Sequence, residues 1–212
     1  MSNEKNIFSL IFSLLNNFTS SLISSIFKPM LEYLKRPLAV TDLEMTGLDA
    51  QLHEIIEIGL IVINQSTFKI IDKFEVKVKP THIKTAQKKA LEKNGYNEKD
   101  WRKAWELKDA VEIYAEKTRD AIFVSQNAYA DWSFMAEAFK LTGVEDLTDY
   151  HRLDLFSVGW SKAEEFDLTK FSLTSMCKSL GIEPEPLPHR AMNGAKKALE
   201  VLRKLSNPQV VF

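Results

Sequence analysis

The stretch LAVTDLEMTGLDAQLHEIIEIGLIVI, residues 38–63, decides the fold of this chain. The first of its two apolar runs carries Asp42 and Glu44, and Leu43 separates them. Because side chains alternate along a strand, both carboxylates share one face at a strand end, while Leu43 points to the other face. Like charges this close raise each other's pKa or bind a cation, and oxygen ligands suit Mg²⁺ or Mn²⁺. The pattern favours a metal site over a simple strand end.

Two later segments supply further polar groups. A short apolar strand, residues 121–125, leads through QNAYAD into a helical stretch, which places Asp131 as a helix N-cap, where an acid is favourable in any case. Near the C-terminus, PHRAM at residues 188–192 opens a last helix that runs to about Leu205. The helix dipole would lower the pKa of His189 there and suit it as a general base, although a histidine at a helix start is often only a capping or surface residue.

Together these three segments resemble the DEDD family of 3′-to-5′ exonucleases, in the subgroup with a histidine in its third motif. This subgroup includes oligoribonuclease and the proofreading subunit of bacterial DNA polymerase III. The motif DLEMTGL, residues 42–48, is most similar to oligoribonuclease, whereas Asn127 to Asp131 and PLPHRAM are more similar to the proofreader-like exonucleases. The resemblance covers about Arg36 to Leu205, with the motifs in the family's order.

The resemblance implies an α/β fold, with an RNase H-like mixed sheet flanked by helices. It also implies that nucleotides are hydrolysed from the 3′ ends of single-stranded DNA or RNA by a two-metal mechanism. Asp42, Glu44 and Asp131 would then be catalytic residues that hold two Mg²⁺ or Mn²⁺ ions, and His189 would take the proton from the attacking water.

The same resemblance assigns four substrate-binding residues. Thr46 and the backbone around it would contact the terminal 3′-hydroxyl, and Leu48 would pack against the last base. Gly47 lets the backbone turn tightly and approach a ligand closely. Asn127 would organise the second motif.

Gly194 departs from the family pattern, which places a fourth metal-binding acid five residues after His189. Glycine inside a helix costs about 1 kcal/mol relative to alanine, and Asn193 is neutral and about 100° away around the helix. Three explanations fit: a natural variant that keeps only nucleic-acid binding, an active site in which water or Asn193 fills the gap, or an engineered or erroneous replacement of Asp. Activity is therefore expected to be weak or lost, and a catalytically inactive nucleic-acid-binding or regulatory module is the alternative function.

Composition agrees with one globular domain plus an appendage. The 212 residues include 28 Lys and Arg against 29 Asp and Glu, so no overall basic charge supports duplex binding by charge alone. The basic-leaning stretch from Lys77 to Lys103 is expected to be a solvated helical surface, with guidance of the strand as the alternative. One cysteine, Cys177, excludes an internal disulfide and is compatible with a cytoplasmic location. A polymerase partner is not specified by the sequence.

The N-terminal residues 1–35 are expected to be an amphipathic helix and linker, separate from an exonuclease-like domain at 36–212. Residues 6–27 carry no charge and alternate an apolar face with a serine and asparagine face at helical spacing. Two roles stay open for this helix: packing on the core or on a second copy in a homodimer, and contact with a membrane surface.

The expected order of elements is three strands, at about 38–44, 54–63 and 69–79, a helical insert to residue 119, a strand and the Asp131 helix. A short strand at 150–153 and helices from 154, 172 and 189 follow.

Overall fold

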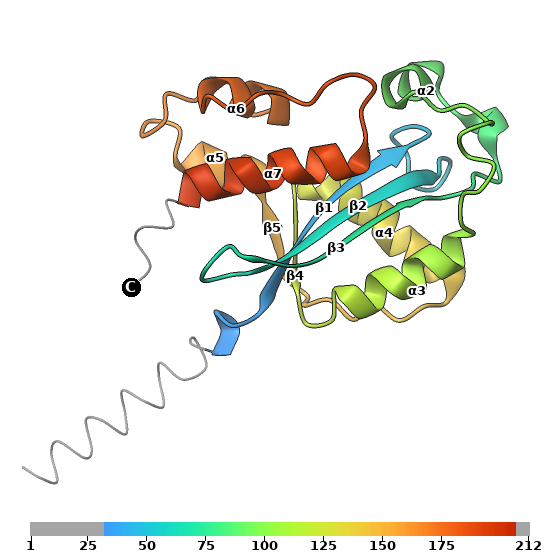
Figure 1. The fold of residues 1–212 in the computed structure, drawn as a ribbon, viewed down its shortest axis with the longest axis horizontal. Helices are drawn as coiled ribbons and strands as arrows, with labels where there is room; N and C mark the ends of the chain where they lie inside the picture. Colours follow the sequence, from blue (N-terminus) through green and yellow to red (C-terminus); the bar gives the residue numbers. More distant parts are fainter. Residues whose placement is uncertain (1–31, 207–212) are drawn as a thin grey trace, which may run out of the picture. The chain divides into compact units, whose positions relative to one another are not determined.

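The computed structural model describes residues 32–206 and contains a five-stranded mixed sheet (Figure 1). The strands are β1 (Pro37–Met45), β2 (Ile55–Asn64), β3 (Ile70–Lys77), β4 (Ile122–Ser125) and β5 (Arg152–Asp154). Their order is β3-β2-β1-β4-β5; β1, β2 and β3 are antiparallel neighbours, and β4 and β5 continue the sheet in parallel with β1. The predicted α/β class with a mixed sheet is confirmed.

Helices connect the strands and cover both faces of the sheet. They are η1 (Ile83–Thr85), α2 (Lys88–Asn94), α3 (Leu107–Lys117), α4 (Ala128–Thr142), α5 (Leu155–Ser161), α6 (Leu173–Ser179) and α7 (Ala191–Ser206). In Figure 1, α7 lies across β1 and β2 on one face, beside α5 and α6, whereas α3 and α4 lie on the other. The helices expected from residues 154 and 172 are present, with Asp154 and Ser172 as N-caps.

Strand β1 divides its side chains between these two faces. Leu43 belongs to the hydrophobic core with α3 and α4, and the Thr41 hydroxyl lies 2.8 Å from the hydroxyl of Tyr114 on α3. Asp42 faces the opposite way, since a Cβ added to Gly194 of α7 would lie 2.2 Å from an Asp42 carboxylate oxygen. The alternation expected for Asp42 and Leu43 is therefore present.

Helix α7 approaches the sheet at a glycine in β2. Gly59 pairs with Asp42 across the β1–β2 ladder, so the two residues share the face that α7 covers. A Cβ built on Gly59 would lie 2.2 Å from the carbonyl carbon of Ala191 and 2.4 Å from the backbone nitrogen of Met192. The missing side chain lets the first turn of α7, and the residues that precede it, come close to the end of β1.

Contacts divide the chain after Arg36, into residues 1–36 and 37–212. The amphipathic helix predicted at residues 6–27 lies outside the described residues, so its proposed contacts with a second copy or a membrane surface stay predictions. Within residues 32–206, no helix is long and apolar enough to cross a membrane.

Candidate functional site

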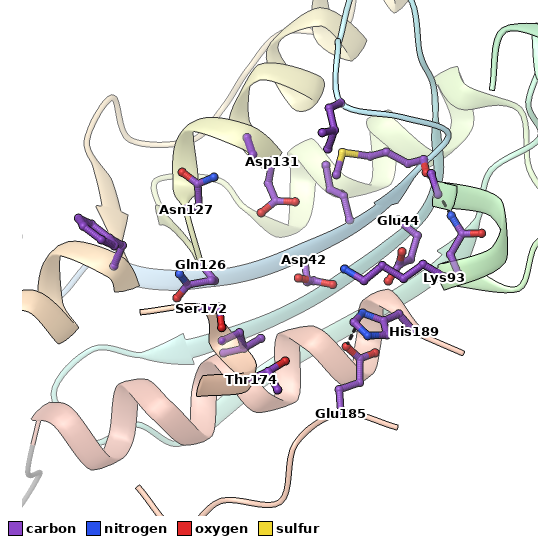
Figure 2. A pocket seen from close by; sticks show the side chains of 18 of the residues that line it. Asp42, Glu44, Lys93, Gln126, Asn127, Asp131, Ser172, Thr174, Glu185 and His189 are labelled. Atoms are coloured by element: carbon purple, nitrogen blue, oxygen red, sulfur yellow. Dashed lines mark hydrogen bonds and ion pairs between the residues drawn. The ribbon is translucent and has the colours of Figure 1, made fainter. Parts of the chain in front are cut away.

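A pocket of about 700 Å³ opens where the end of β1 meets α2, the start of α4, α6 and the loop before α7 (Figure 2). Four residues of the predicted catalytic set line it, namely Asp42, Glu44, Asp131 and His189. They come from β1, α4 and the loop before α7, so the fold brings together groups that lie up to 147 positions apart in the sequence.

Asp131 enters the pocket from the first turn of α4, although it is not the N-cap of that helix. Asn127 is the N-cap, in the left-handed region at φ 57° and ψ 60°, and its N–H donates to the Asp154 carboxylate at 2.9 Å. The predicted N-cap position of Asp131 is therefore wrong, because the helix begins three residues earlier. Asp131 is buried and accepts a hydrogen bond from the Ser125 hydroxyl at the end of β4.

His189 lies near the N-terminus of the last helix, as predicted, two residues before α7 begins at Ala191. Its backbone N–H donates to the carbonyl of Lys93 at 2.9 Å, and its Nδ1 lies 3.2 Å from a carboxylate oxygen of Glu185. Burial lowers the pKa of His189, and the Glu185 carboxylate opposes that shift. The main cause of the lowered pKa is therefore burial, whereas the sequence suggests the helix dipole as the cause.

The three acids of the predicted metal site share one electrostatic environment. Burial, followed by the nearby Asp131 and Glu44 carboxylates, raises the pKa of Asp42 well above its ordinary value. Burial also raises the pKa of Glu44 to about 8 and that of Asp131 to about 7, although the Ser125 hydroxyl and the Leu43 backbone favour the charged form of Asp131. Acids that are buried together in this way gain stability from a bound cation.

Sequence reasoning missed two charged residues of the pocket, Glu185 and Lys93. Among residues 32–206, one group of three His, Cys, Asp or Glu side chains has ligand atoms that all lie within 4.8 Å of one another: Glu44, Glu185 and His189. Asp42 and Asp131 line the same pocket but are not in this group. Lys93, which was assigned to a solvated surface, lines the pocket from α2 and lowers the pKa values of Asp42 and Glu44 by its positive charge.

The predicted substrate-binding residues fall into two groups. Gly47, Leu48 and Asn127 line the pocket, and Leu48 is 83% exposed. Thr46 is fully buried and does not line it; its hydroxyl accepts a hydrogen bond from the Glu54 N–H at 2.9 Å and holds the turn after β1. Sequence reasoning also missed Gln126, Phe156, Phe171 and Ser172, which line the far side of the pocket.

The buried acids predict that the metal-free protein loses stability as the pH rises. Glu57, which lies beside Glu44 across the β1–β2 ladder, has its pKa raised by burial from 4.5 to about 7 even with Arg190 nearby. Between about pH 4.5 and pH 7, such a group keeps its proton in the folded state and releases it in the unfolded state. Its contribution to stability is therefore complete below about pH 4.5 and is lost as the pH rises through about 7.

We expect the thermal midpoint in EDTA to fall by several degrees between pH 5 and pH 8. Glu57→Gln should reduce this slope, whereas the exposed Glu183→Gln should leave it unchanged. A thermal midpoint that is constant or rises between pH 5 and pH 8 would contradict the raised pKa values of the buried acids.

Comparisons with known proteins agree with the fold and place the chain in a family. A model of the exonuclease family of the RNase T type matches residues 39–202. The PolC-type DNA polymerase III of Thermotoga maritima is 28% identical over 163 residues, which is 76% of this chain and 11% of that protein. The PolC-type DNA polymerase III of Bacillus subtilis is 28% identical over 166 residues, or 78% and 11% of the two chains. The chain thus spans about a tenth of the length of these curated relatives.

Solved structures show the same fold at lower identity. Escherichia coli exonuclease I in complex with a dA16 oligonucleotide superposes with a TM-score of 0.69 at 20% identity, over 81% of this chain and 41% of that chain. Cell-death related nuclease 4 superposes with a TM-score of 0.67 at 16% identity, over 81% of this chain and 64% of that chain.

Proposed function

Since the chain belongs to the exonuclease family, we propose that it removes nucleotides from the 3′ ends of single-stranded DNA or RNA with divalent metal ions. The mechanism is that of the histidine-containing DEDD subgroup, slowed because Gly194 stands where a fourth metal-binding acid is expected. The observation that carries this proposal is the meeting of Asp42, Glu44 and Asp131 with His189 in one pocket.

The residues of the pocket fit the metal that this function requires. Carboxylate oxygens are the ligands that Mg²⁺ and Mn²⁺ prefer. Asp42 and Glu44 extend from one face of β1, and Asp131 faces them from α4 (Figure 2). Asp42, Glu44 and Asp131 would hold the ions, which supply positive charge to the phosphate and activate the attacking water.

His189 accepts the proton of the attacking water. Its lowered pKa keeps the imidazole neutral near pH 7, and a neutral imidazole can accept a proton. The hydrogen bond from the His189 backbone to Lys93, and the Glu185 carboxylate beside Nδ1, orient the ring. The geometry thus supplies a base that is held in position by two neighbours.

The mouth of the pocket suits the last nucleotide of a strand. Leu48 presents an exposed apolar side chain on which a base can pack, and Asn127 and Gly47 line the same pocket. A Cβ on Gly47 would lie 2.3 Å from the ring of His53, so any larger residue here would have to displace that ring. Because the Thr46 hydroxyl is engaged by Glu54, we assign contact with the terminal hydroxyl to the backbone of residues 46–48.

A non-catalytic nucleic-acid-binding module is the second candidate. Lys93 favours it, because its ammonium group supplies positive charge to Asp42 and Glu44 without a metal. Gly194 favours it as well, since the first turns of α7 offer the pocket no carboxylate. In this case the pocket would bind a 3′ end and leave it intact.

Recognition of the 3′ end is tested by measuring the affinity of the chain for 5′-fluorescein oligonucleotides from their fluorescence anisotropy. Ca²⁺ replaces Mg²⁺ in this experiment to limit hydrolysis. Oligonucleotides with a free 3′-hydroxyl should bind more tightly than those with a 3′-phosphate. Leu48→Ala should weaken binding about tenfold, because full burial of a leucine side chain contributes roughly 1.5–3 kcal/mol and a base would cover this one in part.

The matched control for this experiment is Leu187→Ala, which removes a leucine of similar exposure, 74%, that does not line the pocket. Equal affinity for both kinds of 3′ end, or equal effects of the two leucine variants, would contradict end recognition. Binding without shortening of the strand would favour the second candidate.

A further inference from the structure

We propose that Glu44, Glu185 and His189 form a transition-metal site that overlaps the catalytic pocket and binds Zn²⁺ more tightly than Mn²⁺ or Mg²⁺. Carboxylate oxygens and imidazole nitrogens are both among the ligands that bind zinc in proteins, and three such ligands leave a fourth position for water. An imidazole nitrogen also favours Zn²⁺ over the harder Mg²⁺, and first-row metals bind such sites in an order that places Zn²⁺ above Mn²⁺.

The distances between the three side chains fit one ion. Their ligand atoms all lie within 4.8 Å of one another, and His189 Nδ1 lies 3.2 Å from a Glu185 oxygen. Ligand atoms that surround a Zn²⁺ ion at about 2.0–2.2 Å lie roughly 3–4 Å apart. Small side-chain rotations therefore suffice to close the group around a cation.

The Glu44 carboxylate points independently to a ligand. Glu44 is only 8% exposed, and within residues 32–206 no hydrogen bond or ion pair to its side chain is present. A carboxylate in such a place is costly to charge, and a cation that binds it directly would add to the positive charge that Lys93 supplies. Figure 2 shows this side chain on β1 directed toward His189 and Lys93.

The other two ligands are fixed by the backbone of the loop before α7. One Glu185 oxygen accepts the Arg190 N–H at 2.7 Å, which leaves the other oxygen facing His189. The His189 N–H donates to the Lys93 carbonyl at 2.9 Å. Outer hydrogen bonds of this kind orient metal ligands and raise affinity for the ion. Glu185 thus contributes a carboxylate from the loop before α7, although α7 itself lacks an acid at Gly194.

An ion at this site has a consequence for hydrolysis. A ring nitrogen of His189 that ligates Zn²⁺ cannot accept the proton of the attacking water. Zn²⁺ should therefore oppose hydrolysis that Mg²⁺ supports. This consequence rests on the proposed function, whereas the binding of Zn²⁺ does not.

The test is a titration of the full chain with Co²⁺, in which binding is measured by visible absorption. Zn²⁺ is then added, and its affinity is obtained from the displacement of Co²⁺. We expect one site, and Glu185→Gln should lower its Zn²⁺ affinity 10- to 100-fold. The side-chain amide that Glu185→Gln introduces can still accept the Arg190 N–H, so the loop should keep its structure. Glu183→Gln, an exposed acid of the same loop, is the matched control and should bind as the unaltered chain does.

Asp131→Asn separates this site from the proposed nuclease site. It should leave Zn²⁺ affinity within about threefold, because Asp131 is outside the group, and it should abolish metal-dependent hydrolysis. His189→Gln is the second variant; it should change the Co²⁺ spectrum even if Glu185→Gln fails to fold. Zn²⁺ binding that is lost in Asp131→Asn but kept in Glu185→Gln and His189→Gln would overturn the proposal. Zn²⁺ binding through Glu185 without any hydrolysis would overturn only the proposed nuclease function.

Discussion

Replacing Gly194 with aspartate is expected to raise the rate of metal-dependent shortening of oligonucleotides at least 10- to 100-fold. The family pattern places a metal-binding carboxylate at this position, and even changes outside the direct ligands cost that much in affinity or activity. The structure supports the choice of position, because a Cβ on Gly194 would lie 2.2 Å from an Asp42 carboxylate oxygen. A carboxylate at 194 would therefore share an ion with Asp42.

The same contact makes Gly194→Ala the necessary control. Any side chain at 194 must displace the Asp42 carboxylate, which can move because it is the end of a side chain. Alanine tests this displacement alone, whereas aspartate adds a ligand as well. We expect a gain of rate in Gly194→Asp, none in Gly194→Ala, and loss of the gain when Asp42→Ala is added. An equal gain in both Gly194 variants would contradict the role of the carboxylate.

Gly59→Ala is expected to lower the free energy of unfolding by about 3 kcal/mol or more, measured by urea denaturation. An added methyl group would lie 2.2–2.4 Å from backbone atoms of Ala191 and Met192. Backbone cannot rotate aside as a side chain can, so β2 and α7 must separate, and overpacking typically costs 1–3 kcal/mol even where side chains can adjust.

The matched control is Gly159→Ala in α5, where the nearest atom to an added Cβ is the sulfur of Met176 at 2.7 Å. Methionine is flexible, and alanine is the better helix former, so this change should stay within about 1 kcal/mol of the unaltered chain. Similar losses for the two substitutions would show that close approach of α7 to β2 is not what Gly59 provides.

The residues of β1 show why much of the fold could be predicted from the sequence. Alternation is a property of any strand, so Asp42 and Glu44 were assigned to one face and Leu43 to the other without knowledge of their neighbours. The apolar runs of β2 and β4 likewise favour buried strands, since they are short and rich in β-branched and aromatic residues. Local patterns are sufficient for such elements.

The missed features depend on contacts between distant segments. Glu185 lies in a proline-rich loop without helical or strand periodicity, so nothing in EPEPLPH places it beside Glu44 of β1. Lys93 lies among other lysines, and only the approach of α2 to the end of β1 brings it to the pocket. The Thr46 hydroxyl is occupied by Glu54, a contact that depends on how the loop between β1 and β2 closes.

The most direct test of the central claim is a time course of 5′-labelled single-stranded DNA and RNA with Mg²⁺ or Mn²⁺, comparing this chain with its Asp42→Ala variant. We predict slow, stepwise shortening from the 3′ end that requires the metal and is absent from Asp42→Ala. Full-length substrate at every time with the unaltered chain and with Gly194→Asp, under both metals, would contradict the claim that this pocket is an exonuclease site.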